Sequence, residues 1–284
     1  MKTVTFPGGL VQPALGLGTW RMGESRRARS SEIAAVRSAL EMGYRVIDTA
    51  EMYGEGGAEE VVGAALSEAL RGSTLRREDV YIVSKAYPHH ASRRELPAAC
   101  ERSLARLGID RIDLYLLHWK GSHPLHETVD AFERLRAQGR IAQWGVSNFD
   151  VDDLEALAAV DGGAQCASNQ VYYSVTERGP ETALMPWMRD RGMPLMAYSP
   201  IDQGAVASDA GLRQLAAAKG CTPAQLALAW VLAQPGVMAI PKAVRESHLR
   251  ENLAAGEIAL DADDLAAIDR LHPAPRRKRP LAML

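Results

Sequence analysis

The segment from Val46 to Glu59 has the sequence VIDTAEMYGEGGAE, which begins as a buried strand and continues as a polar loop. Val46 and Ile47 are branched aliphatic residues. Asp48 follows them at once, and Tyr53 comes five residues later, before a cluster of glycines. A strand that ends in a carboxylate is either a solvated edge or one wall of a reaction site. The rest of the chain distinguishes these two interpretations.

Short apolar runs of this kind recur along the chain and alternate with longer segments of helical periodicity. Several of the runs show little polar alternation, which is typical of strands buried on both faces of a parallel sheet. The eight runs are PALGLGTW, YRVIDTA, VYIVSK, RIDLYLLH, IAQWGVSN, QCASNQ, PLMAYS and GVMAIPK.

The helical segments carry clear boundary signals. Thr222 is followed by Pro223 and Gln225, which predicts a capping box at the start of TPAQLALAWVLAQPG. Ser92 and Glu95 predict a second box, at the start of SRRELPAACERSLARLG, whose final glycine ends the helix.

This order of strands and helices predicts an α/β fold, namely a single (β/α)8 TIM barrel that forms one domain over residues 1–284. The first residues, VTFPGGLVQPALG, predict a hairpin that turns at Pro7-Gly8-Gly9 and closes the bottom of the barrel. A doubly wound open sheet is the alternative. It would usually have a G-x-G-x-x-G turn after its first strand, and GLGTWRMG lacks that spacing.

The composition of the chain indicates which kinds of partner are disfavoured and where in the cell the protein is expected. The chain has 284 residues and a formal net charge of -2, which gives no indication of nucleic acid or of an anionic membrane as a partner. Three scattered cysteines imply neither a disulfide framework nor a metal site. The start lacks the apolar run of a secretory signal, and no apolar stretch approaches the roughly 18 residues of a membrane span. We therefore expect a cytoplasmic protein and, from its polar helical faces, a monomer.

All eight predicted strands end in side chains that can bind or react. In a (β/α)8 barrel these ends converge on one mouth, where active sites lie. A single polar strand end is ordinary because it emerges into water, so the interpretation depends on the whole set. The set comprises Trp20, Asp48, Lys85, His118 with Trp119, Ser147 with Asn148, Asn169 with Gln170, Tyr198 with Ser199, and Pro241 with Lys242.

Four of these groups favour protonation of a carbonyl oxygen. Asp48 and Lys85 lie on adjacent predicted strands and can form an ion pair that keeps Lys85 protonated. Tyr53 can reach the same place, where the ammonium would lower its pKa from the usual value of about 10. His118 can hydrogen-bond a substrate oxygen. Acyl transfer is disfavoured because no serine or cysteine pairs with this histidine in a known motif, and Lys and Tyr are poor metal ligands.

Reduction of a carbonyl also needs a hydride from a cofactor. Ser147, Asn148 and Gln170 could hold a carboxamide, and Tyr198 could stack on a nicotinamide ring. Lys242, Arg245 and His248 lie at a predicted strand end and helix start, where phosphates are commonly bound.

Together these segments resemble the aldo-keto reductases. The matching pieces are GLGTW, VIDTAEMYG, IVSKAYP, LLHW, GVSNF, NQVYY, AYSP and IPKA…EN, which occur in family order from Gly16 to Asn252. The chain is most similar to the short bacterial members that reduce methylglyoxal and related dicarbonyls. The resemblance implies a barrel that binds NADPH without a Rossmann motif, with Asp48, Tyr53, Lys85 and His118 as the catalytic residues and Tyr53 as the proton donor.

The resemblance also implies the cofactor contacts. Ser147, Asn148 and Gln170 match the carboxamide contacts, Tyr198 the stacking ring and Lys242 a contact to the 2'-phosphate. The further implied contacts are Gly18, Thr19, Trp20, Asp48, Ser199, Pro200, Ile240, Ala243, Val244, Arg245, His248, Glu251 and Asn252. Three of these depart from the family pattern: Ala243 replaces a serine or threonine, Arg245 a small polar residue and His248 an arginine.

The expected substrate pocket is open, because the chain lacks the long carboxyl-terminal loop of larger members. Its expected walls are Trp20, Met52, Tyr87 and Trp119. His89 and His90 are expected at the surface rather than at a metal. Two other functions stay open: a cofactor-binding regulatory protein on the same scaffold, and a hydrolase built on His118 and Asp48 that needs no nicotinamide.

Overall fold

A closed parallel barrel forms the centre of the computed structural model, which describes residues 2–72 and 75–284. Each strand pairs with the next one in the chain, and two parallel bridges, Leu15 with Ala239 and Gly18 with Lys242, join the first strand to the last. The (β/α)8 prediction is therefore confirmed. The strands are β3 (Leu17–Gly18), β4 (Val46–Asp48), β5 (Tyr81–Ala86), β6 (Ile112–Leu117), β7 (Ile141–Ser147), β8 (Asn169–Tyr172), β9 (Leu195–Tyr198) and β10 (Val237–Ala239).

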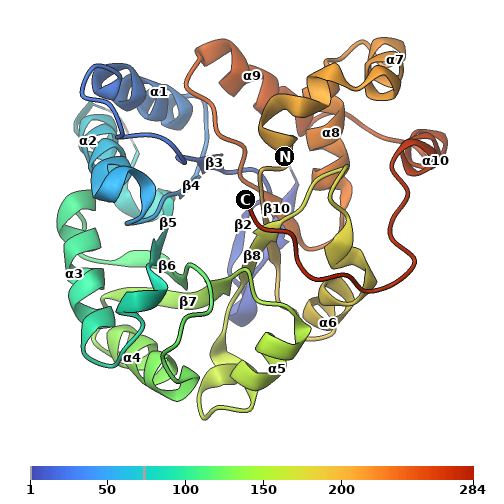
Figure 1. Cartoon of the computed structure of the whole chain (residues 1–284). Helices are drawn as coiled ribbons and strands as arrows, with labels where there is room; N and C mark the ends of the chain where they lie inside the picture. Colours follow the sequence, from blue (N-terminus) through green and yellow to red (C-terminus); the bar gives the residue numbers. More distant parts are fainter. Residues whose placement is uncertain (1, 73–74) are drawn as a thin grey trace.

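Helices form a ring around this barrel (Figure 1). They are α1 (Arg29–Glu41), α2 (Gly57–Gly72), α3 (Glu95–Leu107), α4 (Leu125–Ala137), α5 (Val151–Ala158), α6 (Leu184–Arg189), α7 (Ala210–Ala218), α8 (Pro223–Ala233), α9 (Glu246–Ala255) and α10 (Ala262–Leu271). No single helix among the described residues is long and apolar enough to cross a membrane. Helices α7 and α8 reach the length and apolar composition of a membrane span only when they are taken together, and the two helices meet at a bend of 84°.

Local signals set several helix ends as predicted. In α8, the Gln225 N–H donates to Thr222 Oγ1 at 3.2 Å, and the Thr222 N–H donates to Gln225 Oε1 at 3.0 Å. At α3 the predicted box is wrong: the Glu95 N–H donates to Ser92 Oγ at 3.1 Å, but the reciprocal bond to Glu95 is not formed, and the regular helix begins at Glu95 after Arg94, which gives no side-chain cap. Gly108 ends α3 with a φ of +65°, which a glycine adopts without steric cost.

The amino-terminal hairpin consists of β1 (Thr3–Thr5) and β2 (Val11–Pro13), which pair antiparallel. Its turn lies at Pro7–Gly9, as expected. Gln143, near the start of β7, donates from Nε2 to the Pro7 carbonyl at 3.0 Å, and the Phe6 ring lies 5.5 Å from that of Tyr81 at the start of β5. The hairpin therefore covers the amino-terminal ends of the strands, which confirms its predicted place at the bottom.

All six residues of β5 are buried, between the barrel interior and the helices. One of them is Lys85, whose side chain has no exposed surface. A buried ammonium is costly unless it is paired and hydrogen-bonded, so the surroundings of Lys85 must compensate for its charge.

Candidate active site

Non-glycine residues with a positive φ, a strained backbone conformation, lie near the carboxyl ends of the strands. Within the described residues, every non-glycine residue with a positive φ lies in a loop that follows β3, β4, β7 or β9. These residues are Arg21 (+62°), Glu55 (+51°), Asn148 (+60°), Ser199 (+48°), Asp202 (+50°) and Gln203 (+55°). Such conformations cost of order 1–3 kcal/mol each and occur most often at functional sites. The strain therefore marks the same mouth as the polar strand ends.

An ion pair lies at the centre of this mouth. Lys85 Nζ is 2.8 Å from Asp48 Oδ2 and donates to the Thr49 carbonyl at 2.9 Å, while Gln170 Nε2 donates to Asp48 Oδ1 at 2.8 Å. Burial raises the pKa of Asp48 and lowers the pKa of Lys85, and in each case the charge of the partner opposes the shift. Each charge therefore depends on the other, and loss of either would leave an uncompensated buried ion.

The phenol of Tyr53 completes the cluster from the loop after β4. Its OH lies 3.2 Å from Lys85 Nζ, and the side chain is almost fully buried. The expectation that Lys85 lowers the pKa of Tyr53 is wrong for this structure. Burial raises that pKa well above 10, and the negative charge of Asp48 raises it further. Because burial disfavours the phenolate and the charge of Asp48 adds to this effect, Tyr53 is held here as a protonated phenol.

His118 lies directly after β6 and beside Tyr53. The two ring centroids are 5.7 Å apart and the ring planes meet at 75°. Burial, and then the charge of Lys85, lower the pKa of His118 well below its ordinary value, so the imidazole is neutral at pH 7. Its Nδ1 is buried and has no hydrogen-bond partner among the described residues. Buried polar atoms are rarely left unpaired, so this ring is suited to a bound ligand.

A second cluster of polar side chains lies at the ends of β7, β8 and β9. Ser147 Oγ donates to the Gln170 carbonyl at 2.8 Å, Asn148 Nδ2 donates to the His118 carbonyl at 3.2 Å, and the Tyr198 OH donates to Asn148 Oδ1 at 3.0 Å. These residues are brought together as predicted. Gln170, the third predicted carboxamide contact, lies beside them and donates from Nε2 to Asp48 Oδ1.

The remaining predicted cofactor residues form a strip from β3 across β10 to α9. Thr19 Oγ1 donates to the Asp48 carbonyl at 2.9 Å, and a Cβ on Gly18 would lie 2.6 Å from the Ile240 carbonyl oxygen, so β3 and the end of β10 pack closely. Along the strip, Pro200, Ile240, Ala243 and Asn252 are buried, Ser199, Val244, His248 and Glu251 are half-buried, and Lys242 and Arg245 are exposed.

Lys242 and Arg245 have the properties of an anion site. Within the described residues, neither side chain has an acidic partner at ion-pair distance, and Arg245 immediately precedes the first turn of α9. The amino-terminal end of a helix favours negative charge, and two free cations beside it add to that preference.

The predicted pocket walls lie on loops around the mouth. Tyr87 and Trp119 meet edge to face with ring centroids 6.2 Å apart, and Met52 directly precedes Tyr53. Trp20 follows β3 and is half-buried, with the Arg21 guanidinium 4.4 Å above its ring.

The carboxyl-terminal segment reaches the mouth where an open substrate pocket is expected. Figure 1 shows the chain after α10 running back across the ring of strands, with the C-terminus near its centre. Lys278 Nζ lies 3.1 Å from Asp152 Oδ1 and 3.4 Å from Asp150 Oδ2, and the backbone of Leu284 interacts with Tyr198. The basic run that contains Lys278 indicates that this segment could pair with acidic side chains. It does not indicate which ones, because Asp150 and Asp152 are distant in the sequence.

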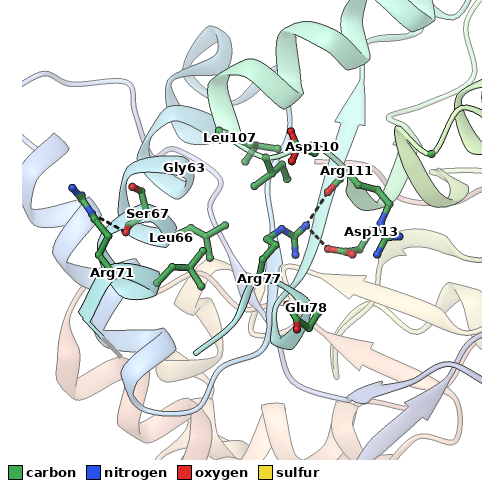
Figure 2. A pocket seen from close by; sticks show the side chains of 14 residues that line it. Gly63, Leu66, Ser67, Arg71, Arg77, Glu78, Leu107, Asp110, Arg111 and Asp113 are labelled. Carbon is green, nitrogen blue, oxygen red and sulfur yellow. Dashed lines mark hydrogen bonds and ion pairs between the residues drawn. The ribbon is translucent and has the colours of Figure 1, made fainter. Parts of the chain in front are cut away.

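A pocket between α2, α3 and the start of β6 has no part in this site (Figure 2). Arg77 crosses it and donates from Nη2 to Asp113 Oδ2 at 2.7 Å and to the Arg111 carbonyl at 2.9 Å. The pocket lies near the amino-terminal ends of the strands, away from the mouth, and none of the predicted site residues line it.

Known proteins match the whole chain. The aldo/keto reductase family model matches residues 14–273. Methylglyoxal reductase YeaE of Escherichia coli (strain K12) is 46% identical, over 100% of this chain and 99% of that protein. Glyoxal reductase of Bacillus subtilis (strain 168) is 35% identical, over 95% and 92%. A crystal structure of an aldo/keto reductase from Klebsiella pneumoniae in complex with NADP and acetate has a TM-score of 0.94 and 48% identity, over 100% of this chain and 99% of that one.

Proposed function

The chain belongs to the aldo/keto reductase family, and from that premise we propose that it is an NADPH-dependent reductase of small aldehydes and ketones. Dicarbonyls such as methylglyoxal and aromatic aldehydes are the proposed substrates, and the products are alcohols. The observation that carries the proposal is the buried cluster in which Lys85 Nζ contacts both Asp48 and the Tyr53 OH, with a neutral His118 beside them.

The residues around the mouth fit a nicotinamide dinucleotide. Asn148 and Ser147 offer an amide and a hydroxyl for a carboxamide, and Tyr198 offers an aromatic ring. Lys242 and Arg245, which have no acidic partner among the described residues, offer cations for a 2'-phosphate, which favours NADPH over NADH. When bound, NADPH would supply a hydride to the carbonyl carbon. The related Klebsiella pneumoniae structure in complex with NADP supports this choice of cofactor.

The proposed chemistry of the chain itself is proton donation to the carbonyl oxygen. Tyr53 keeps its proton at neutral pH because its pKa is raised, and it donates only when that oxygen becomes strongly basic. The Lys85 ammonium, 3.2 Å away, stabilises the phenolate that forms, and Asp48 holds the ammonium in place. The neutral His118 orients the substrate oxygen through a hydrogen bond.

The test is the loss of NADPH absorbance in the presence of methylglyoxal or 4-nitrobenzaldehyde. The proposal predicts turnover that needs both the cofactor and the carbonyl. Tight NADPH binding without turnover of any carbonyl would favour the regulatory alternative, and hydrolysis without a nicotinamide would favour the hydrolase. A cytoplasmic monomer remains part of the proposal.

A further inference from the structure

Glu51 lies in the loop that carries Tyr53, and its carboxylate is bonded to the next loop around the mouth. The side chain is only 5% exposed. Its Oε1 accepts the backbone N–H of Tyr87 at 2.6 Å and lies 2.9 Å from His90 Nδ1, and its Oε2 lies 3.7 Å from Arg102 Nη2. The Glu51 N–H itself donates to the Lys85 carbonyl at 3.2 Å. One residue therefore links β5, the Tyr53 loop and the segment from Tyr87 to His90.

Tyr87 is the residue that these bonds hold in place. Its ring stacks on His89 at 4.7 Å and meets Trp119 edge to face. Its OH donates to Glu55, which is exposed. Trp119 in turn directly follows His118, so Tyr87 and Trp119 together form a wall next to the proposed catalytic group.

The burial of Glu51 makes this attachment strong. A carboxylate removed from water is costly unless donors surround it, and here it accepts from a backbone amide and faces an imidazole and a guanidinium. Charge-assisted hydrogen bonds of this kind are about twice as strong as neutral ones. Without the carboxylate, the Tyr87 N–H and His90 would lose their acceptor, and the segment would lose its fixed position.

We propose that Glu51 is a positioning residue that fixes Tyr87 against Trp119 and thereby sets which aldehydes fit beside Tyr53. The inference rests on the proposed reductase function. A large aromatic aldehyde needs the Tyr87 and Trp119 walls for packing, whereas methylglyoxal is too small to depend on them. Glu51 therefore acts on substrate selection and leaves the proton transfer itself unchanged.

The experiment compares Glu51→Ala and Glu51→Gln with the matched control Glu60→Ala, whose carboxylate is exposed in α2 and pairs with Arg29. For each variant, kcat and KM are measured with 4-nitrobenzaldehyde and with methylglyoxal, and the NADPH Kd is measured by fluorescence. We expect Glu51→Ala to raise KM for 4-nitrobenzaldehyde by about tenfold, the cost of one lost anchoring interaction of about 1.4 kcal/mol. KM for methylglyoxal and the NADPH Kd should change by less than about twofold, which is under about 0.4 kcal/mol.

The conservative variant Glu51→Gln distinguishes the loss of the Tyr87 contact from a general loss of folded structure. The side-chain amide oxygen that Glu51→Gln introduces can still accept the Tyr87 N–H, so this variant should recover most of the lost selectivity, and Glu60→Ala should match the wild type. If Glu51→Ala does not fold, Glu51→Met, which keeps the length of the side chain but has no oxygen acceptor, replaces it. Addition of Glu51→Met to Tyr87→Ala should then cause no further rise in KM for 4-nitrobenzaldehyde.

A KM for 4-nitrobenzaldehyde in Glu51→Ala equal to that of the wild type, with turnover retained, would overturn this inference and leave the proposed function standing. A parallel loss of kcat with both substrates would also overturn it, because it would mean that Tyr53 itself had moved. Absence of turnover in the wild type would instead overturn the proposed function, and this inference with it.

Discussion

Lys85 shows how a single residue can determine the chemistry of the site. Its ammonium is fully buried, and it contacts Asp48 Oδ2 at 2.8 Å, the Thr49 carbonyl at 2.9 Å and the Tyr53 OH at 3.2 Å. A structural ion pair would need only the first two partners. The third places a buried phenol where its conjugate base would be stabilised, which supports the proposal that Tyr53 is the acid.

Arg245 provides a test of cofactor choice at this scale. We predict that Arg245→Ala weakens NADPH binding by about tenfold or more, because a charge-assisted contact to phosphate is worth about 1.5–3 kcal/mol. NADH binding should change little, since NADH has no 2'-phosphate. Fluorescence titration of the wild type and the variant with each cofactor gives the Kd values that check this prediction.

Arg250→Ala is the matched control, because this exposed arginine of α9 already pairs with Glu246 at 2.6 Å. An equal loss of NADPH and NADH affinity in Arg245→Ala would show that Arg245 does not touch the 2'-phosphate.

Among the elements, α8 illustrates a helix whose start is set by adjacent residues. Thr222 and Gln225 exchange their two hydrogen bonds at its amino-terminal end, and Pro223 occupies the first turn. Because α8 carries a large buried surface, including Trp230, its start contributes to the packing of the barrel.

We predict that Thr222→Ala lowers the free energy of unfolding by about 1 kcal/mol, the usual cost of a lost N-cap. In a chain of this size, that corresponds to a decrease in Tm of about 2–4 °C. Calorimetry or thermal circular dichroism measures it, with Ser247→Ala, an exposed hydroxyl within α9, as the control. A Tm equal to that of the wild type would show that the cap does not limit the stability.

The same elements show what the sequence could predict. The capping box of α8, the hairpin and the strand order depend on neighbouring residues or on a repeated pattern, and the structure confirms them. The pKa of Tyr53 was predicted in the wrong direction because burial and the position of Asp48 are properties of the assembled fold. The bonds of Glu51 to Tyr87 and His90, and of Lys278 to Asp150 and Asp152, join segments that are distant in the sequence, so no local pattern could predict which residues pair.

At the scale of the whole molecule, the mouth is assembled from all eight strand ends and from the carboxyl-terminal segment. Closure of β3 against β10 brings Gly18 and Thr19 beside the residues that precede α9. The proposed cofactor strip therefore exists only when the barrel is closed. In a fold without a glycine-rich phosphate loop, this closure brings together the residues that we propose to contact the dinucleotide.

The outer surface predicts a monomer. The large hydrophobic side chains that are exposed in the described part of the chain are Leu10, Val11, Leu271, Met283 and Leu284. They come from the hairpin, the end of α10 and the carboxyl-terminal segment, and a stable interface would usually need a larger contiguous apolar patch. Light scattering after size exclusion should give a mass near 30.8 kDa, and a mass of twice that value would contradict this prediction.

The central claim is that Tyr53 donates the proton, and the Tyr53→Phe variant tests it most directly. The rate of NADPH oxidation with saturating methylglyoxal should fall by about 100-fold or more, as expected for loss of a general acid. The NADPH Kd should stay within about twofold of the wild type, a change of under about 0.4 kcal/mol. Turnover near the wild-type rate in this variant would contradict the account.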